Sequence, residues 1–398
     1  MRVAYIASLY FAVVNVVIAA DSVIWRQEIS CDPNSTCRPG AIAVDRADNK
    51  VVILGTSEQS GTGETNFWLW KIDPNGNVIH KKSLGLISKY NSLMVRSFGM
   101  RAIVKQNTGD IVKLNVDDVN SASLSITDRS IQTHTVKMGA EQNWSKGVLL
   151  HDMTSCPNGN LLFVGQEDLG GNGIIIKTDL VGNVVWKKTF DLGQTEIFSS
   201  VTCDPDGKDY YVVGLSASMA GKMTFAGPAT VCVLRYDDNG ELKASTYIEG
   251  GVAPWPTSFP KVIYLPSGFV LVSYDKSKNA KVTELYIKKY TRELDPLDEK
   301  LIMQTKESSP PAFYDICAIP ENQFVIAGVI NFKDLRIYEC GADGTILQTL
   351  ELDGEVRGGG VYVDYLAGKI FVAFAKLPKE NENDVKIELL ALKPYKTN

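Results

Sequence analysis

Histidine is nearly absent from this 398-residue chain, which contains only His80, His134 and His151. None of the three forms an HExxH motif or completes a cysteine–histidine quartet with the spacing of a zinc site. No CxxCH motif is present, which excludes the usual covalent attachment of a c-type haem. We therefore expect no metal and no cofactor, and we expect the histidines to be surface or packing residues.

Excess positive charge and long helical periodicity are also lacking. The chain has 41 Lys and Arg against 46 Asp and Glu, a net charge of −5, without a basic stripe. A nucleic acid is therefore not the expected partner. No long segment repeats its apolar residues at the helical period, so the chain is expected to be all-β. No GxSxG motif marks a serine nucleophile, although a catalytic triad can form from residues far apart in sequence.

The most regular feature present is the segment IIIKTDLVGNVVWKKTF, residues 174–190. Its β-branched flanks favour two strands, and Gly182-Asn183 predicts a two-residue turn because both residues tolerate positive φ. The clear copies have their turn glycines 106, 58 and 104 residues apart, which indicates a repeat of about 53 residues. Clear and degraded copies of this hairpin begin at Leu69, Ile111, Cys232, Leu285 and Arg336.

Two further strands precede each hairpin, and the second of them is a short apolar run. Four strands in a unit of this length are typical of a propeller blade, so we predict a seven-bladed β-propeller of four-stranded blades, with six or eight blades as the alternatives. The second strand carries a glycine, which predicts close packing against the next blade. This glycine is found at Gly55, Gly165, Gly214 and Gly328.

The two ends of the chain are predicted to close the ring. The segment SVIWRQEIS, residues 22–30, matches NVVWKKTFD, residues 183–191, so Trp25 corresponds to Trp186. The last repeat ends after its third strand. We therefore expect residues 23–29 to supply the outermost strand of the last blade, which removes an exposed edge.

Residues 1–20 have the pattern of a signal peptide, with Arg2, an apolar stretch, and Ala19-Ala20 before the expected cleavage site. The alternative is an uncleaved anchor, but the apolar run is short and interrupted. The prediction is an exported protein, in a secreted or periplasmic-type compartment, with residues 21–398 as one domain. No other segment is expected to span a membrane.

Seven cysteines are present, and Cys31 and Cys37 enclose a turn-rich loop. In an exported chain this pair is expected to form a disulfide that clamps the closing strand. Cys156 and Cys203 lie near the ends of innermost strands in adjacent blades. We expect these two, like Cys232 and Cys340 in third strands, to be buried free thiols.

Aspartates recur in two places along the repeat. Those in the turns at Asp73, Asp204 and Asp237 do not complete a calcium-binding loop, so turn capping is expected. Others fall on the predicted innermost strands, which line the channel. A cation bound there is one interpretation, and turn capping with solvated carboxylates is the favoured one for Asp45, Asp152, Asp315 and Asp364.

Loop lengths distinguish the two faces of the predicted disc. The connections between second and third strands, and from each outermost strand to the next blade, are long and emerge on one face. We expect this face to bind another protein, because exposed aromatic residues and arginine are concentrated at interfaces. The alternative is that the rings fold back over the disc. The candidate binding residues are Trp144, Trp255, Tyr90, His134, Phe225 and Arg357, and the same face carries glycosylation patterns at Asn34 and Asn143.

The run DLVGNVVWKKTFDLG resembles the repeats of secreted bacterial propellers and, more loosely, quinoprotein-type propellers. The latter carry a docking tryptophan in most blades, whereas only Trp25 and Trp186 hold that position here, so no quinone is expected. The chain is also similar to propeller subunits of extracytoplasmic redox complexes, such as the β subunit of anammox hydrazine synthase. The resemblance implies a non-catalytic scaffold subunit that binds other subunits. The alternatives are a dehydrogenase or hydrolase with a site in the channel, and a structural protein of an extracellular matrix.

Overall fold

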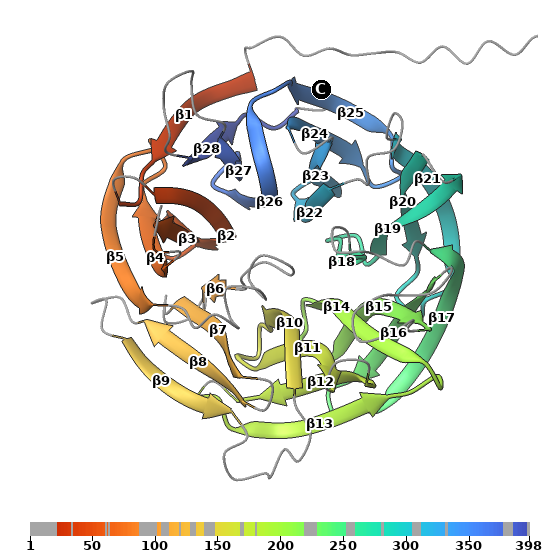
Figure 1. Ribbon diagram of the computed structural model, residues 1–398. Helices are drawn as coiled ribbons and strands as arrows, with labels where there is room; N and C mark the ends of the chain where they lie inside the picture. The colour runs from red at the N-terminus through yellow and green to blue at the C-terminus, as the bar shows by residue number, and fades with distance from the viewer. Residues whose placement is uncertain are drawn as a thin grey trace, which may run out of the picture.

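The structure is a computed structural model (Figure 1), in which the described residues form 28 β-strands around a central channel. It describes residues 22–32, 35–59, 62, 64–86, 102–104, 111–118, 121–127, 133–138, 148–167, 171–179, 181–218, 229–251, 259–279, 282–304, 312–330, 333–376 and 385–395. Across these ranges, no helix has the length and apolar character needed to cross a membrane.

All the sheets are antiparallel, and each begins with a strand at the channel and ends at the rim (Figure 1). The first is β2 (Ser35–Asp45), β3 (Lys50–Gln59), β4 (Thr65–Ile72) and β5 (Val78–Leu86). The second is β6 (Ala102–Val104), β7 (Ile111–Asp118), β8 (Ser121–Thr127) and β9 (Thr133–Met138). The third is β10 (Val148–Ser155), β11 (Leu161–Glu167), β12 (Gly173–Thr178) and β13 (Val184–Phe190).

The fourth sheet has eight strands, in two successive sets of four. These are β14 (Thr195–Cys203), β15 (Asp209–Ala217), β16 (Ala229–Asp237) and β17 (Leu242–Gly251), then β18 (Lys261–Tyr264), β19 (Val270–Asn279), β20 (Val282–Tyr290) and β21 (Pro296–Gln304). The fifth sheet is β22 (Ala312–Ile319), β23 (Gln323–Ile330), β24 (Asp334–Gly341) and β25 (Ile346–Leu352). The sixth is β26 (Val356–Leu366), β27 (Lys369–Lys376), β28 (Lys386–Leu392) and β1 (Val23–Ile29).

The prediction of seven separate blades is therefore wrong, because the strands form six hydrogen-bonded sheets. The difference arises at β18, which pairs with β19 only as far as Ser273. Since β19 continues to Asn279, part of its edge remains open, and Gly251 at the end of β17 pairs there with Lys276. This single pair joins the two sets into one sheet.

The predicted closure is confirmed. Strand β1 pairs antiparallel with β28, from Val23 opposite Leu392 to Ile29 opposite Ile387. An ion pair supports the pairing, since a guanidinium nitrogen of Arg26 on β1 lies 3.4 Å from Oε1 of Glu388 on β28. The N-terminal strand thus belongs to the same sheet as the last three strands of the chain.

The hairpin turns are longer than predicted. Strand β12 ends at Thr178 and β13 begins at Val184, so residues 179–183 form the connection in place of a two-residue turn. Oδ1 of Asp179 accepts hydrogen bonds from the backbone N–H groups of Val181 and Asn183, at 3.0 and 2.9 Å. Gly182 has φ +94°, as the turn requires. The same capping occurs at Asp73 and Asp237, which confirms turn chemistry at these aspartates.

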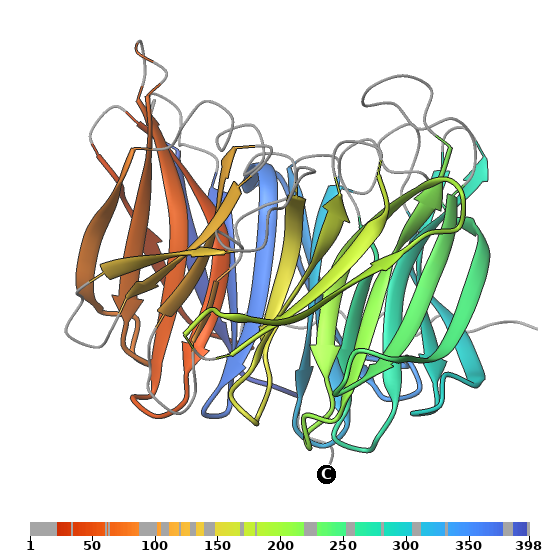
Figure 2. The same cartoon turned by 90° about the horizontal axis from the view of Figure 1, so that it is seen from below.

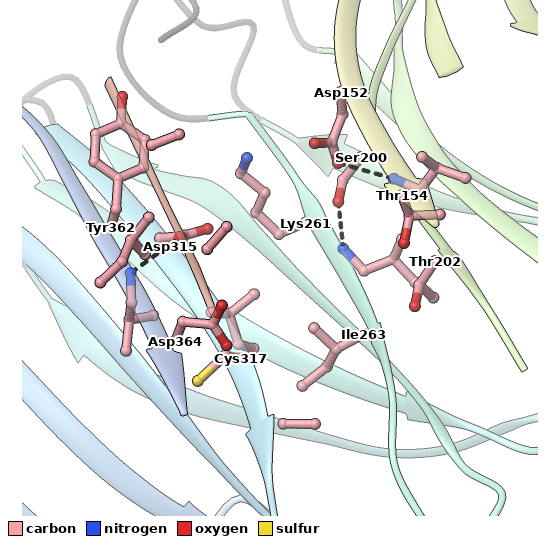
Figure 3. Close-up of a pocket in the computed structure, with 18 of the residues that line it drawn as sticks. Asp152, Thr154, Ser200, Thr202, Lys261, Ile263, Asp315, Cys317, Tyr362 and Asp364 are labelled. Atoms are coloured by element: carbon pink, nitrogen blue, oxygen red, sulfur yellow. Dashed lines mark hydrogen bonds between the residues drawn. The ribbon is translucent and has the colours of Figure 1, made fainter. Parts of the chain in front are cut away.

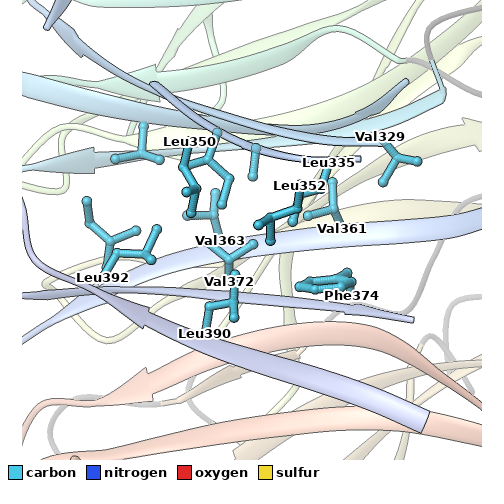
Figure 4. Packing of buried hydrophobic residues seen from close by; sticks show 14 of the residues in the cluster. Val329, Leu335, Leu350, Leu352, Val361, Val363, Val372, Phe374, Leu390 and Leu392 are labelled. Atoms are coloured by element: carbon cyan, nitrogen blue, oxygen red, sulfur yellow. The ribbon is translucent and has the colours of Figure 1, made fainter. Parts of the chain in front are cut away.

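Apolar side chains fill the spaces between neighbouring sheets. Figure 4 shows one such cluster, in which side chains of the fifth sheet contact those of the sixth. Burial of this apolar surface is the main stabilising contribution to the ring. The cluster includes Val329, Leu335, Leu350, Leu352, Val361, Val363, Val372, Phe374, Leu390 and Leu392.

The glycines of the second strands pack closely, but mainly against their own sheet. A Cβ atom on Gly165 would lie 1.9 Å from the carbonyl oxygen of Leu149, and one on Gly214 would lie 2.3 Å from that of Ile197. Both carbonyls belong to the innermost strand of the same sheet, beside a β-bulge. The predicted contact with the neighbouring blade is present at Gly55, where Ile387 would lie 2.9 Å away.

Candidate binding site in the central channel

The innermost strands enclose a polar cavity of about 400 Å³ in the channel (Figure 3). Asp152, Asp315 and Asp364 line it, as predicted, but Asp45 does not. Asp45 is buried, and its Oδ1 accepts hydrogen bonds from the N–H groups of Ala47 and Asp48, both at 3.1 Å. It is therefore a turn-capping residue and not a channel residue.

Two of the channel carboxylates connect neighbouring innermost strands. Oδ2 of Asp152 accepts a hydrogen bond from the N–H of Val201 on β14, at 3.1 Å. Oδ2 of Asp315 accepts one from the N–H of Val363 on β26, also at 3.1 Å. These aspartates thus help to hold the channel wall together.

Asp364 is a cavity carboxyl group with a raised pKa. Burial, with a smaller effect from the negative charge of Asp315, raises the pKa of its carboxyl group to about 7 against the opposing effects of the Tyr365 N–H and Arg46. Burial also raises the pKa of the nearby Cys317 thiol well above its usual value. A carboxyl group whose pKa is raised in this direction is a candidate for proton transfer.

The basic and aromatic residues of the cavity were not among the predicted site residues. Lys261 lies on β18, Arg46 follows β2, and Tyr362 lies on β26. One sequence feature could have indicated Lys261 as a cavity residue, because this lysine begins the apolar run KVIY on an innermost strand. With these residues the cavity carries charges of both signs. Among the residues that the structure describes, no three His, Cys, Asp or Glu side chains are grouped to hold a metal ion.

Most of the predicted binding residues of the loop face lie outside the described residues. These are Tyr90, Trp144, Phe225 and Trp255, together with the acceptor residues Asn34 and Asn143. His134 and Arg357 were expected in loops, but they lie on strands β9 and β26, and the description does not extend to their side chains. The binding face formed by this set therefore stays a prediction.

Two histidines have the environments of packing residues. His151 on β10 is buried and stacks on Phe259, with ring centroids 6.2 Å apart. His80 on β5 is half-buried, and burial together with the positive charges of Lys71 and Lys82 lowers its pKa.

The predicted disulfide between Cys31 and Cys37 is present, with Cα atoms 5.9 Å apart. It connects the residues after β1 to strand β2, where the chain passes from the sixth sheet to the first. Lys81 supports it, because its Nζ donates a hydrogen bond to the carbonyl oxygen of Cys31 at 2.7 Å. The closing strand is thus clamped covalently.

Trp25 and Trp186 dock onto the turns of neighbouring sheets. Nε1 of Trp25 donates a hydrogen bond to the carbonyl oxygen of Pro74 at 3.1 Å, and Nε1 of Trp186 donates to that of Asp238 at 3.0 Å. A Cβ atom on Gly240 would lie 2.9 Å from the Trp186 ring, so this glycine makes room for the indole. These tryptophans therefore pack one sheet against the next.

No protein-family model matches the chain, and no curated protein matches it in sequence. Solved structures do match its fold. The polysaccharide lyase Uly1 has a TM-score of 0.56 at 12% identity, over 89% of each chain. A protein of unknown function from Dyadobacter fermentans has a TM-score of 0.53 at 11% identity, over 93% of this chain and 99% of its own.

A third similar structure is the β-propeller domain of the Trilobed protease from Pyrococcus furiosus. Its TM-score is 0.50 at 7% identity, over 91% of this chain and 94% of its own. Structural similarity at such low sequence identity shows only that the fold is shared. The architecture and these comparisons together identify the chain as a β-propeller.

Proposed function

We propose that the protein is a non-catalytic binding protein that docks another protein on its loop face. The loop face is defined as the side where connections such as those between β15 and β16 and between β17 and β18 emerge. The observation that supports this proposal is the difference between the two ends of the disc. At the opposite end, the turn face, short turns join the strands (Figure 2).

On the turn face, backbone polar groups form hydrogen bonds within the turns themselves. In several turns an aspartate caps the backbone N–H groups, as Asp73, Asp179, Asp237 and Asp343 do. Such turns have few groups left for a partner. On the loop face, residues 218–228 separate β15 from β16 and residues 252–260 separate β17 from β18. Long connections over a rigid scaffold are the usual location of binding residues in such folds.

The proposed setting is an extracytoplasmic complex, in which the propeller is a scaffold subunit. The Cys31–Cys37 disulfide supports an oxidising compartment. The signal-peptide pattern of residues 1–20 supports export. A redox complex is the proposed kind of assembly because the sequence resembles its propeller subunits.

The test measures the affinity for a partner that co-purifies with the tagged full chain from its native source. Trp144→Ala and Trp255→Ala are expected to weaken binding about tenfold or more, because interface tryptophans are common anchors. Asn75→Ala and Asn239→Ala on the turn face are the controls and should leave the affinity unchanged. If only the control variants lose binding, the partner binds the turn face and not the loop face. A native protein that is strictly monomeric, without a co-purifying partner, would contradict the proposal.

A second candidate is an enzyme with its site in the channel, and the raised pKa of Asp364 supports it. This carboxyl group would act as the general acid or base of a hydrolase or dehydrogenase. The expected evidence is an activity that follows a group with a pKa near 7 and is lost in Asp364→Asn. An activity that Asp364→Asn retains with an unchanged pH profile would exclude this assignment.

A further inference from the structure

Two of the five free cysteines meet at the boundary between the third and fourth sheets. Cys156 directly follows β10, and Cys203 is the last residue of β14. Both belong to one apolar cluster, in which Cys156 is buried and Cys203 is half-buried. Sγ of Cys203 lies 3.7 Å from the carbonyl oxygen of Ser155, the residue next to Cys156.

The two thiol groups also contact each other. A hydrogen bond with the Cys203 side chain is the largest cause of a raised pKa at Cys156, and burial of Cys156 is the second. The Cys156 thiol is therefore protonated at neutral pH in the reduced protein, and it lies beside the thiol of Cys203.

Contacts on both sides of this pair fix the position of the two strands. Toward the middle of the channel, Asp152 accepts the hydrogen bond from Val201. Toward the turn face, Nδ2 of Asn158 donates a hydrogen bond to the carbonyl oxygen of Gly207 at 3.1 Å. A Cβ atom on Gly207 would lie 3.1 Å from the Asn158 side chain, so these turns are in direct contact. The cysteines cannot separate without breaking these interactions.

The other cysteines are placed differently. Cys31 and Cys37 already form a disulfide, which requires an oxidising environment. Cys232, Cys317 and Cys340 lie on β16, β22 and β24. An environment that oxidises the first pair also acts on a second pair of adjacent thiols.

We propose that Cys156 and Cys203 form a second disulfide, which joins the third sheet covalently to the fourth. This bond would replace the buried free thiols that the sequence alone favours. It would cross a boundary between sheets that is otherwise held by apolar packing, hydrogen bonds and the Lys177–Asp238 ion pair. The Cys31–Cys37 bond, by comparison, is made where the chain itself passes between sheets.

The reaction needs a disulfide-bearing oxidant, either an exported thiol–disulfide oxidoreductase or glutathione disulfide. Cys203 is the more exposed residue, so its thiolate attacks the oxidant first and releases one thiolate. The Cys156 thiolate then attacks Sγ of Cys203 and releases the second. Two thiols thus lose two electrons and two protons, and the oxidant is reduced to two thiols.

The experiment maps the disulfides of the full mature chain after incubation with glutathione disulfide. Free thiols are alkylated in denaturant, and the protein is digested with trypsin without reduction. The expected product is a cross-linked pair of peptides, residues 147–177 and 189–208. Its mass is two hydrogens below the sum of the separate peptides, and three cysteines per chain are alkylated: Cys232, Cys317 and Cys340.

The Cys31–Cys37 disulfide is the internal control, because it reports that the sample was oxidised. Alkylated Cys156 and Cys203 in a sample with an intact Cys31–Cys37 bond would overturn the proposal. Cys232→Ser should retain the cross-linked peptides, and Cys203→Ser should lose them and leave Cys156 alkylated. A link from Cys156 to any other cysteine in the unmutated protein would also overturn it.

Discussion

At the residue scale, the absence of a Cβ atom in glycine allows neighbouring strands to approach closely. Gly165 faces a bulge in β10, and the carbonyl oxygen of Leu149 occupies the space where a Cβ atom would be. A backbone atom at 1.9 Å cannot be displaced by a side-chain rotation. The residue is therefore required by the sheet itself.

We expect Gly165→Ala to lower the free energy of unfolding by about 3 kcal/mol, in the range of overpacked core substitutions. Gly354→Ala is the control, because nothing lies within 4 Å of its Cβ position and only its φ of +70° opposes the change. That control should lose about 1 kcal/mol. Urea denaturation measures both values, and equal losses would show that the bulge relaxes easily.

Two buried carboxyl groups should make stability depend on pH. Burial raises the pKa values of Asp364 and Glu339 to about 7, above those of the unfolded chain. Their contribution to stability is complete below about pH 4 and is lost as the pH rises through about 7. The free energy of unfolding should therefore fall between about pH 4 and pH 7, by at most about 1.4 kcal/mol per pH unit for each group.

The variant Asp364→Asn/Glu339→Gln isolates this effect from other titrating groups such as His80. Its free energy of unfolding should vary less with pH than that of the unmodified protein. Denaturation curves at several pH values give the difference in slope. Parallel pH dependences would show that the two carboxyl groups do not titrate in this range.

At the scale of the element, the outermost strands hold the ring together through their contacts with neighbouring turns. Trp186 on β13 reaches the turn after β16, where Asp238 also accepts bonds from Lys177 and Tyr210. The tryptophan ring lies 6.1 Å from the ring of Tyr210, measured between centroids. One turn thus receives contacts from two strands of the preceding sheet.

Trp186→Ala is expected to lower the free energy of unfolding by about 2 kcal/mol, less than for a fully buried ring because Trp186 is half-buried. Val185→Ala is the matched control, since Val185 is the next residue along β13 and 56% exposed. The control should stay within about 0.5 kcal/mol of the unmodified protein. Similar losses in the two variants would show that the docking contact contributes little.

At the scale of the whole molecule, closure of the ring depends on one strand from the start of the chain. Strand β1 covers β28, where Glu388 is fully buried and pairs with Arg26 and Lys376. Without β1, the edge of β28 is unpaired and Glu388 loses one of its two positive partners.

Deleting residues 21–30 is therefore expected to cause aggregation or a large fall in melting temperature, because an unpaired edge strand associates with other chains. Glu28→Gln is the control, which removes exposed ion pairs while β1 stays in place. Its melting temperature should change little. Light scattering and thermal denaturation distinguish the two, and a truncated protein that melts like the full chain would contradict the closure.

The sequence by itself determined the strands, their grouping in fours and the closing strand, because these depend on local patterns that repeat along the chain. Alternating β-branched residues define the strands, and capped turns such as the one at Asp179 separate them. The match between Trp25 and Trp186 identified the strand that closes the ring. The disulfide between Cys31 and Cys37 was predictable for the same reason, since the two residues are close in sequence.

Only the tertiary structure decided how the repeats meet. The Gly251–Lys276 pair joins two predicted blades into one sheet, so that seven predicted blades become six sheets. This pairing is possible because the short strand β18 ends early and leaves part of the β19 edge open. The channel cavity combines Arg46, Lys261 and Asp364 from strands far apart in sequence, and no local pattern encodes that proximity. The meeting of Cys156 with Cys203 follows from the way neighbouring sheets align, and that alignment exists only in the folded ring.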